Sequence, residues 1–287
     1  MFSSFRIKKR ARDTHKGDYG HLLVIAGSPG MTGAAYLCCE AAVLSGAGLV
    51  TLAIPKGLNP IMAKKLTEVM TLPLSETAQG SLSKGALKNI AAFSQKCDCI
   101  AIGPGLSQNR QTQQLIRSLI RRLNIPMVID ADALNALAGH LDILRAAGSE
   151  RRATIITPHP GEMARLIDKK ASIINKDKKI VARKFADEYN VTTVLKGFRT
   201  TVASPDKKIY VNSTGNPGMA SGGCGDVLTG IIAAFLAQGM AGFKAARLGV
   251  YIHGLTGDIA AKEKSEISLK ATDLLEFLPQ AFKKVYG

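Results

Sequence analysis

The sequence predicts an α/β protein with a mostly parallel central sheet and helices on both of its faces. Six short β-branched or aliphatic runs, each bounded by Gly or Pro, recur along the chain, and longer segments with helical spacing separate them. A strand that is buried on both faces is continuously apolar rather than alternating, so this arrangement is typical of a parallel sheet between helices. Because the 287 residues contain no repeat, low-complexity tract or linker, we predict one domain spanning residues 1–287.

The expected elements follow one another in the order of the chain. The strands are His21–Gly27, Leu49–Pro55, Cys99–Gly103, Pro126–Asp130, Thr154–Thr157 and Thr193–Lys196. The helices between them are Ala34–Ser45, Lys84–Ser94, Gln111–Leu123 and Ile174–Tyr189. Two short β runs within Arg199–Asn212 flank Ser204-Pro205-Asp206, which predicts a hairpin. Three further helices are expected near Gly225–Gln238, Phe243–Lys264 and Thr272–Tyr286.

Gly, Asp, Asn and His residues gather where four of these strands end. The segments are Gly103-Pro104-Gly105, Asp130-Ala131-Asp132 with Asn135, Thr157–Glu162 and Lys196-Gly197. In an open parallel sheet, ligands bind outside the carboxyl ends of the strands. The sequence therefore predicts a small-molecule site along this edge of the sheet.

The strongest motif lies within Asn212–Gly230, which reads NSTGNPGMASGGCGDVLTG and leads directly into an apolar helix. Glycines let the backbone approach a ligand closely, and a helix amino terminus offers free N–H groups to an anion. The turn is not a Walker A loop, because no Lys-Ser/Thr pair follows the glycines. It is not a dinucleotide fingerprint either, because it opens a late helix rather than the first βα unit.

Asp226 is an unexpected residue in such an anion-binding turn, since its carboxylate would repel a phosphate. One reading is that Asp226 caps the helix, as Asp often does. The favoured reading is that it accepts a proton from a substrate hydroxyl as that oxygen attacks a phosphoryl group. Phosphoryl transfer on a scaffold other than the P-loop is the chemistry that the turn predicts.

These residues resemble the ribokinase-like superfamily and, within it, the ADP- or ATP-dependent NAD(P)H-hydrate dehydratases. The resemblance covers nearly the whole chain in several long motifs. They are His15–His21, Gly27–Ala35, Ser45–Gly48, Gly103–Gly105, Pro158–Glu162, Lys196-Gly197 and Asn216–Thr229. The fold that it implies is a ribokinase-like three-layer α/β/α sandwich.

The resemblance also implies an activity. The S-form of hydrated NADH or NADPH would lose water and return to the intact cofactor. Transient phosphorylation of the ring hydroxyl by a nucleotide with Mg²⁺ would drive the step. ADP is favoured over ATP as co-substrate, and a homo-oligomer is expected, with a tetramer as one option. No counterpart of the epimerase half of bifunctional relatives is recognised in these residues, so only the dehydratase step is expected here.

Site residues carried over from the family fall into three groups. The catalytic group is Asp226 as base with Gly225 and Gly223 in the anion hole. The nucleotide-binding group is Lys196, Gly197, Phe198, Arg199, Thr200 and Gly225, and the substrate-binding group is Ala34, Gly105, His159 and Asp226. No metal ligand is assigned. Cys224 stands where the family pattern has Thr, which leaves a hydroxyl contact at that position in doubt.

Read from the residues alone, several of these side chains keep a structural alternative. Lys196 is either a phosphate partner at a strand end or a solvated edge lysine. His159, between two prolines, more often has a structural role. Glu162 is a first-turn acid or a group that orients a Mg²⁺-bound water. Asp130 and Asp132 suggest a metal pair, although Asp132 also fits a helix start.

Two alternative functions remain at this stage. A ribokinase-like kinase for hydroxyethylthiazole or pyridoxal would use the same Asp and glycines but release a phosphorylated product. A nucleic-acid-binding protein is suggested by 38 Lys+Arg against 22 Asp+Glu, a net charge of +16. However, aromatics are only 5% of the chain and the basic clusters are dispersed, so a nucleic-acid function is disfavoured. The clusters are Arg6–Lys16, Arg117–Arg122, Lys176–Lys184 and Lys283-Lys284.

The cysteines and the apolar segments indicate the compartment. Five cysteines without a CxxC spacing are expected to be small buried hydrophobes in a reducing environment. The amino terminus carries charge without an apolar segment behind it, and polar residues and glycines interrupt the two longest apolar stretches. We therefore expect neither a secretory signal nor a membrane span, and a cytoplasmic location.

Overall fold

A nine-stranded sheet forms the centre of the protein in the computed structural model, which describes residues 10–147 and 152–286. The strand order is β3-β2-β1-β4-β5-β6-β7-β8-β9. The strands from β1 to β7 are parallel, whereas β8 and β9 run antiparallel to their neighbours. The strands are β1 (His21–Ile25), β2 (Leu49–Pro55), β3 (Met70–Leu74), β4 (Cys99–Ile102), β5 (Met127–Ile129), β6 (Thr154–Ile156), β7 (Thr192–Leu195), β8 (Thr201–Ala203) and β9 (Ile209–Val211).

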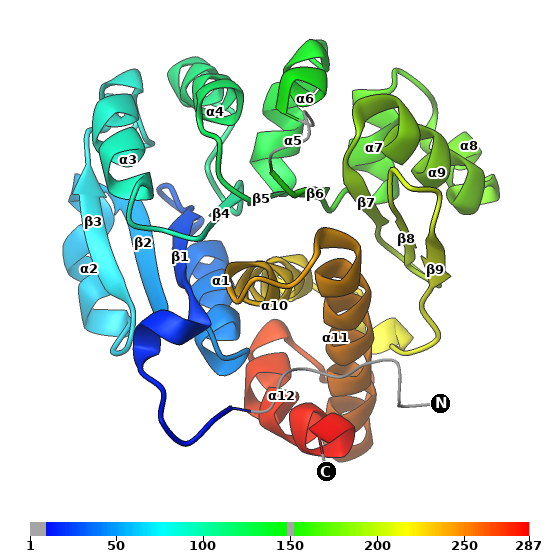
Figure 1. Ribbon diagram of the computed structural model, residues 1–287. Helices are drawn as coiled ribbons and strands as arrows, with labels where there is room; N and C mark the ends of the chain where they lie inside the picture. Colours follow the sequence, from blue (N-terminus) through cyan, green and yellow to red (C-terminus); the bar gives the residue numbers. More distant parts are fainter. Residues whose placement is uncertain (1–9, 148–151, 287) are drawn as a thin grey trace.

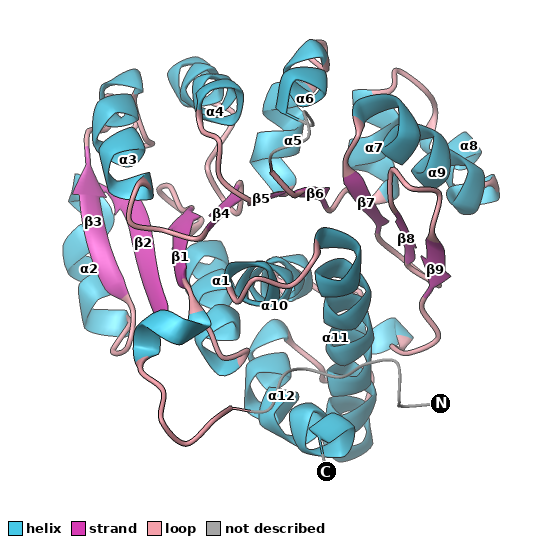
Figure 2. Cartoon of the chain, viewed as in Figure 1, coloured by secondary structure: helices cyan, strands magenta, loops and turns pink. Residues whose placement is uncertain are grey.

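Helices cover both faces of this sheet (Figures 1 and 2). On one face lie α1 (Thr32–Leu44), α2 (Asn59–Lys65), α10 (Cys224–Ala237), α11 (Gly242–Lys264) and α12 (Ala271–Tyr286). On the other lie α3 (Leu87–Ser94), α4 (Arg110–Arg122), α5 (Ala131–Leu137), α6 (Asp142–Ala147), α7 (Pro160–Leu166), α8 (Ala171–Lys176) and α9 (Lys178–Tyr189). This is the three-layer α/β/α sandwich that the sequence predicts.

Both faces of the strands are buried, as their uninterrupted apolar runs predict. In β1, Leu22 and Val24 pack into the core beneath α1 and α10, while Leu23 and Ile25 pack into the core on the opposite face. All four side chains have no exposed surface. Successive residues of a strand point to opposite faces, so an alternating polar pattern would have left one layer of helices without a partner.

Strands β1 and β4 are adjacent in the sheet although β2 and β3 separate them in sequence. From β1 the chain adds strands on one side as far as β3, and then continues on the other side with β4. Such a switch point opens a crevice at the carboxyl ends of the two strands. Here the loops after β1 and β4 contact each other directly. The N–H of Gly27 donates to the carbonyl of Pro104 at 2.9 Å, and the Ser28 hydroxyl donates to the carbonyl of Gly105 at 2.8 Å.

The structure adds elements that the sequence prediction missed and divides one that it expected. The missed elements include the edge strand β3 and the short helices α2 and α6. Met70 and Pro73 of β3 are exposed, so the strand lacks the continuous apolar run of its neighbours. The expected helix Ile174–Tyr189 is two helices, α8 and α9, because the backbone leaves helical geometry at Asp177, where ψ is 48°.

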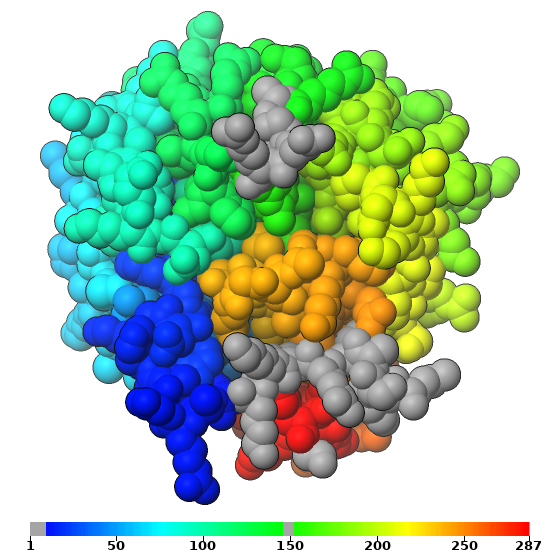
Figure 3. Space-filling view, viewed as in Figure 1, coloured from blue at the N-terminus to red at the C-terminus, as the bar shows by residue number. Residues whose placement is uncertain are grey.

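Segments far apart in sequence share one surface of the molecule. In Figure 3 the orange atoms of the α10–α11 region lie between blue amino-terminal residues and the yellow hairpin region. Most side chains of the described basic clusters face outward, for example those of Arg121, Arg122, Lys283 and Lys284, while Arg6–Lys16 begins outside the described residues. Among the residues that the structure describes, no helix has both the length and the apolar character needed to cross a bilayer.

The contact between α1 and α10 requires a glycine. A Cβ atom on Gly230 would lie 2.2 Å from the carbonyl oxygen of Cys38 and 2.9 Å from the Cβ of Ala41. Backbone atoms cannot move aside as a flexible side chain does, so any larger residue must push α10 away from α1.

We expect Gly230→Ala to lower the free energy of unfolding by about 1–3 kcal/mol through overpacking at this contact. Urea titration followed by circular dichroism measures the change. The matched control is Gly33→Ala in α1, where an added Cβ has no neighbour within 4 Å. An unfolding midpoint of Gly230→Ala equal to that of the native chain would contradict the packing described here.

Candidate active site

The first turn of α10 faces the carboxyl ends of the central strands. Gly223 caps this helix with φ of 93°, a conformation that favours glycine, and no side chain makes a capping hydrogen bond. A Cβ on Gly223 would also lie 2.4 Å from Leu37 of α1. The glycine therefore allows the turn to form and leaves the first N–H groups of a 14-residue helix available to an anion.

Asp226 is the third residue of α10 and is only partly exposed. Its carboxylate makes no hydrogen bond to any described residue, so it does not cap the helix. Burial, followed by the negative charge of Asp130, raises the pKa of Asp226 to about 7. A carboxylate that is free of hydrogen bonds and exchanges its proton near neutral pH has the properties of a general base.

Lys196, at the end of β7, lies beside this turn. Its Nζ is 2.7 Å from Oδ1 of Asp130 and 3.8 Å from Oε2 of Glu162, and a Cβ on Gly225 would lie 3.4 Å from it. Burial acts to lower the pKa of Lys196, but Asp130 and Glu162 outweigh that effect and raise it. Lys196 is therefore a positively charged group against the first turn of α10, and the alternative of a solvated edge lysine is wrong.

His159 and Glu162 form a reciprocal cap at the start of α7. Nδ1 of His159 accepts from the N–H of Gly161 at 3.0 Å, and the N–H of His159 donates to Glu162 at 2.8 Å. Burial and the charge of Lys196 lower the pKa of His159. The ring is thus fixed by its own helix and still half exposed, within reach of the charge of Lys196.

The segment after β7 forms an exposed turn into β8. Gly197 adopts φ of 115°, and Lys178 of α9 donates to the carbonyl of Phe198 at 2.8 Å. The hydroxyl of Thr200 donates to the carbonyl of Gly197 at 2.9 Å. The side chain of Phe198 is 88% exposed, so this apolar ring is free to meet a ligand.

Ala34 and Gly105 meet at the switch point. A Cβ on Gly105 would lie 2.8 Å from the carbonyl oxygen of Met31 and 3.1 Å from the Cβ of Ala34, and φ at Gly105 is 60°. Leu37, one helical turn after Ala34, packs against Gly223, so the switch point lies next to the turn of α10. The structure thus places the predicted substrate residues and the predicted anion hole along one edge of the sheet.

The sequence prediction missed two side chains that support the turn. The hydroxyl of Thr229, one helical turn after Asp226, donates to Oδ2 of Asp130 at 2.7 Å. His253 of α11 donates from Nε2 to the carbonyl of Cys224 at 2.9 Å, and burial lowers the pKa of this histidine to about 4. The three-residue spacing from Asp226 to Thr229 is a helical signal that points to one shared face, whereas His253 has no such signal in the sequence.

The position of Cys224 clarifies the departure from the family pattern. Its thiol is buried and lies 3.3 Å from the hydroxyl of Ser221. A small polar contact within the turn is therefore kept although the hydroxyl of Thr is absent. All five cysteines of the chain are free, and Cys97 alone among them is only half buried.

No cluster of three or more His, Cys, Asp or Glu side chains able to hold a metal occurs within residues 10–147 and 152–286. The acidic groups near Lys196 already have protein partners. Oδ1 and Oδ2 of Asp130 bind Lys196 and Thr229, and Glu162 binds the backbone of His159. These residues do not provide a dedicated cage for a resident metal ion.

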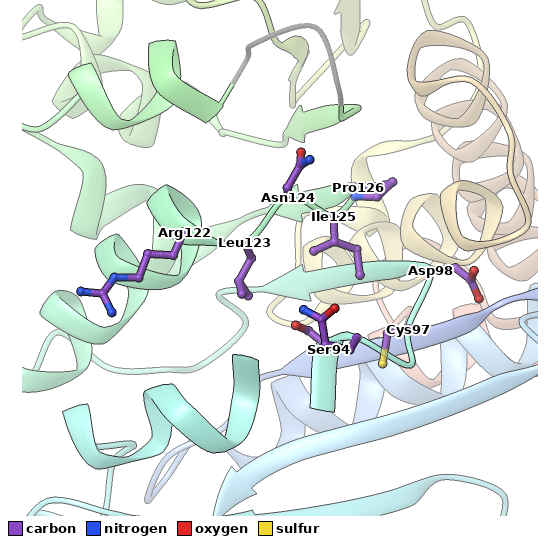
Figure 4. A pocket seen from close by; sticks show the side chains of 9 residues that line it. Ser94, Cys97, Asp98, Arg122, Leu123, Asn124, Ile125 and Pro126 are labelled. Carbon is purple, nitrogen blue, oxygen red and sulfur yellow. The ribbon is translucent and has the colours of Figure 1, made fainter. Parts of the chain in front are cut away.

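A pocket of about 530 Å³ lies at the opposite edge of the sheet, before β4 and β5 (Figure 4). Its ionisable lining residues are Cys97, Asp98 and Arg122. Burial raises the pKa of the Cys97 thiol to about 12, and Asp98 accepts the backbone N–H of His21 at 2.7 Å. The Cys97 thiol is therefore poorly ionised at neutral pH, whereas Asp226, Glu162 and Lys196 lie together at the edge that carries α10.

Comparison with known proteins agrees with this geometry. A family model described as NAD(P)H-hydrate dehydratase matches residues 22–280. A bifunctional NAD(P)H-hydrate repair enzyme of Moorella thermoacetica is 46% identical over 98% of this chain, and the match covers 52% of that enzyme. The chain thus spans about half the length of the bifunctional relatives that it matches.

Two shorter proteins match over most of their own length. An ADP-dependent (S)-NAD(P)H-hydrate dehydratase of Neisseria meningitidis is 37% identical over 91% of this chain and 83% of its own. The crystal structure of an ADP/ATP-dependent NAD(P)H-hydrate dehydratase from Bacillus subtilis, co-crystallized with ATP/Mg²⁺, superposes with a TM-score of 0.84 at 31% identity. It covers 97% of this chain and 94% of the other.

The raised pKa of Asp226 has a consequence for stability. The pKa of this carboxyl is 3.8 in the unfolded chain and about 7 in the folded chain. The folded state therefore binds the proton more tightly than the unfolded state does. The folded state is therefore favoured below pH 4 and loses this stabilisation as the pH rises to 7. Above pH 7 the buried charge is a cost.

We expect Asp226→Asn to unfold at a higher temperature than the native chain at pH 8. The free energy of unfolding should rise by up to about 4 kcal/mol, which corresponds to the change in the pKa of Asp226 on folding. At pH 5 the two proteins should differ much less, because the native carboxyl is then protonated. Differential scanning calorimetry at both pH values measures the difference. A gain of equal size at pH 5 and pH 8 would show that the carboxylate carries no such cost.

Proposed function

The chain belongs to the NAD(P)H-hydrate dehydratase family, and from this premise we propose that it dehydrates the S-form of hydrated NADH or NADPH, with ADP as the favoured co-substrate. The observation that carries the proposal is Asp226, a base with a pKa of about 7 in the first turn of α10, beside the ammonium of Lys196. The activity would repair a damaged metabolite and make the protein a lyase.

The proposed reaction proceeds in two stages. Asp226 accepts the proton of the ring hydroxyl as its oxygen attacks the terminal phosphoryl group of ADP, and the P–O bond to the departing AMP breaks. The C–O bond of the phosphorylated ring then breaks, inorganic phosphate leaves, and the ring loses a proton to restore the dihydronicotinamide. Lys196 and the N–H groups of Gly223 and Gly225 would stabilise the negative charge on the transferred group.

The remaining predicted residues have proposed places around this centre. Lys196 to Thr200 would bind the nucleotide, with the exposed ring of Phe198 available for stacking and the Arg199 guanidinium 5.6 Å from the centre of that ring. Ala34, Gly105 and His159 would contact the hydrated nicotinamide. Mg²⁺ would arrive bound to the nucleotide phosphates, in keeping with its preference for phosphate oxygens and water, since the described residues form no metal cage.

We also propose that the protein is cytoplasmic and forms a homo-oligomer, with a tetramer as one option. The five free cysteines support a reducing compartment. Light scattering on the purified chain measures the oligomeric state. A small-molecule kinase is the second candidate function, because it would use the same phosphoryl transfer. The matched family favours the dehydratase.

The decisive assay incubates the protein with chemically hydrated NADH, Mg²⁺ and either ADP or ATP. Recovery of the dihydronicotinamide absorbance, with one AMP or ADP formed per molecule repaired, is the expected result. Absence of recovery with both nucleotides would refute the dehydratase. A phosphorylated product that accumulates without recovery would favour the kinase.

We expect Asp226→Asn to lower kcat by roughly 10²-fold or more, because the base that accepts the hydroxyl proton is gone. ADP should still bind, since the helix turn and Lys196 remain in place, and isothermal titration calorimetry measures this. Asp98→Asn, which removes a carboxylate at the opposite edge of the sheet, is the matched control and should keep native activity. Full activity of Asp226→Asn would refute the assigned base.

A further inference from the structure

Asp130 follows β5 and is 1% exposed, so its carboxylate is shielded from solvent. Each of its two carboxylate oxygens has a partner from a different part of the fold. Oδ1 lies 2.7 Å from Nζ of Lys196 at the end of β7, and Oδ2 accepts the hydroxyl of Thr229 in α10 at 2.7 Å. One buried carboxylate therefore joins two strand ends and the helix that carries the catalytic turn.

Lys196 needs such a partner to have a defined position. A lysine ammonium is a point charge on a flexible four-carbon stem, and its geometry is set by what it contacts. Here the contact with Asp130 is short and shielded from water, since the Lys196 side chain is 17% exposed and that of Asp130 is 1% exposed. The second carboxylate, Glu162, is farther away at 3.8 Å and already accepts the N–H of His159.

We propose that Asp130 is a positioning residue, which holds the ammonium of Lys196 against the amino-terminal turn of α10 and acts on the reaction only through that lysine and through Asp226. Because the role of Lys196 in phosphoryl transfer belongs to the proposed function, the activity part of this inference rests on it. The contacts of Asp130 with Lys196 and Thr229 are independent of the proposed function.

The negative charge of Asp130 has a second effect at Asp226. Charged and titratable groups face Asp226 from five directions, namely Asp130 after β5, Asp132 in α5, Glu162 in α7, Lys196 after β7, and Cys38 in α1, with Cys224 on its own helix. After burial, Asp130 is the largest contributor that raises the pKa of Asp226, and Lys196 opposes it. Removing the charge of Asp130 should therefore lower the pKa of Asp226.

The variant Asp130→Asn tests both effects. The amide has only one oxygen, so when that oxygen accepts from Thr229 its NH₂ group faces Lys196, and the ion pair is lost. We expect kcat to fall by about 10-fold or more with a small change in KM for the hydrated substrate, since a misplaced ammonium fails chiefly in the transition state. The acid limb of the kcat/KM profile should move to lower pH, because Asp226 would ionise more readily.

A double-mutant cycle distinguishes an effect of Asp130 through Lys196 from a general loss of structure. If Asp130 acts through Lys196, then Asp130→Asn should change kcat by less than about 2-fold in a Lys196→Met background. Thr229→Val, which removes only the hydrogen bond to Oδ2, serves as the milder variant if Asp130→Asn folds poorly. It should lower kcat by about 3-fold, and this loss should also vanish in the Lys196→Met background.

A measurement without substrate keeps the inference testable on its own. The carboxyl resonance of Asp226 in ¹³C-labelled protein, assigned from the Asp226→Asn spectrum, should titrate near pH 7 in the native chain and at lower pH in Asp130→Asn. Asp98→Asn, at the opposite edge of the sheet, should leave both the titration and kcat unchanged. Should the native chain fail to repair hydrated NADH, this titration alone decides the inference.

Each of the following results would overturn the proposal. One is a kcat loss of the same size with and without Lys196, which would mean that Asp130 supports the fold rather than the lysine. The other is an unchanged Asp226 titration in Asp130→Asn, which would mean that the two carboxylates do not interact. Loss of thermal stability without either expected change would likewise assign Asp130 a purely structural role.

Discussion

The shared carboxylate of Asp130 is the interaction on which the arrangement of the site depends. Burying a carboxylate is unfavourable unless its oxygens are paired, and here a lysine and a threonine pair them. Lys196 follows β7 and Thr229 lies in α10. Because each oxygen of Asp130 binds one of them, the carboxylate fixes β7 and α10 relative to β5. The first turn of α10 consequently faces Lys196, and the carboxylate of Asp226 and the ammonium of Lys196 lie at the same edge of the sheet.

Much of the sheet and of the central helices follows from the sequence, because burial on both faces leaves a clear apolar pattern. The run Leu49–Pro55 coincides with β2, and the expected helices near α1, α4, α10 and α11 differ from the structure by at most two residues at either end. The edge strand β3 escaped prediction since its exposed residues lack that pattern. The break at Asp177 is a local change of backbone that neighbouring helical spacing conceals.

The candidate site could be located from the sequence but its connections could not. Glycines and Asp226 within one turn, followed by an apolar helix, pointed to an anion site at a helix amino terminus. The ion pair between Asp130 and Lys196 joins residues 66 positions apart, and neither residue carries a local signal of the other. In the same way His159 was expected at a strand end, but its capping of α7 depends on the backbone geometry around Gly161.

The distribution of the site along the chain has a consequence for folding. Ala34 stands near one end of the sequence and Asp226 near the other, and α1 and α10 pack together through Gly230 with no room for a side chain. Contacts of such high sequence separation close long loops, which slows folding and makes it cooperative. Neither half of the chain contains both α1 and α10, so this edge of the sheet can form only when the entire topology is complete.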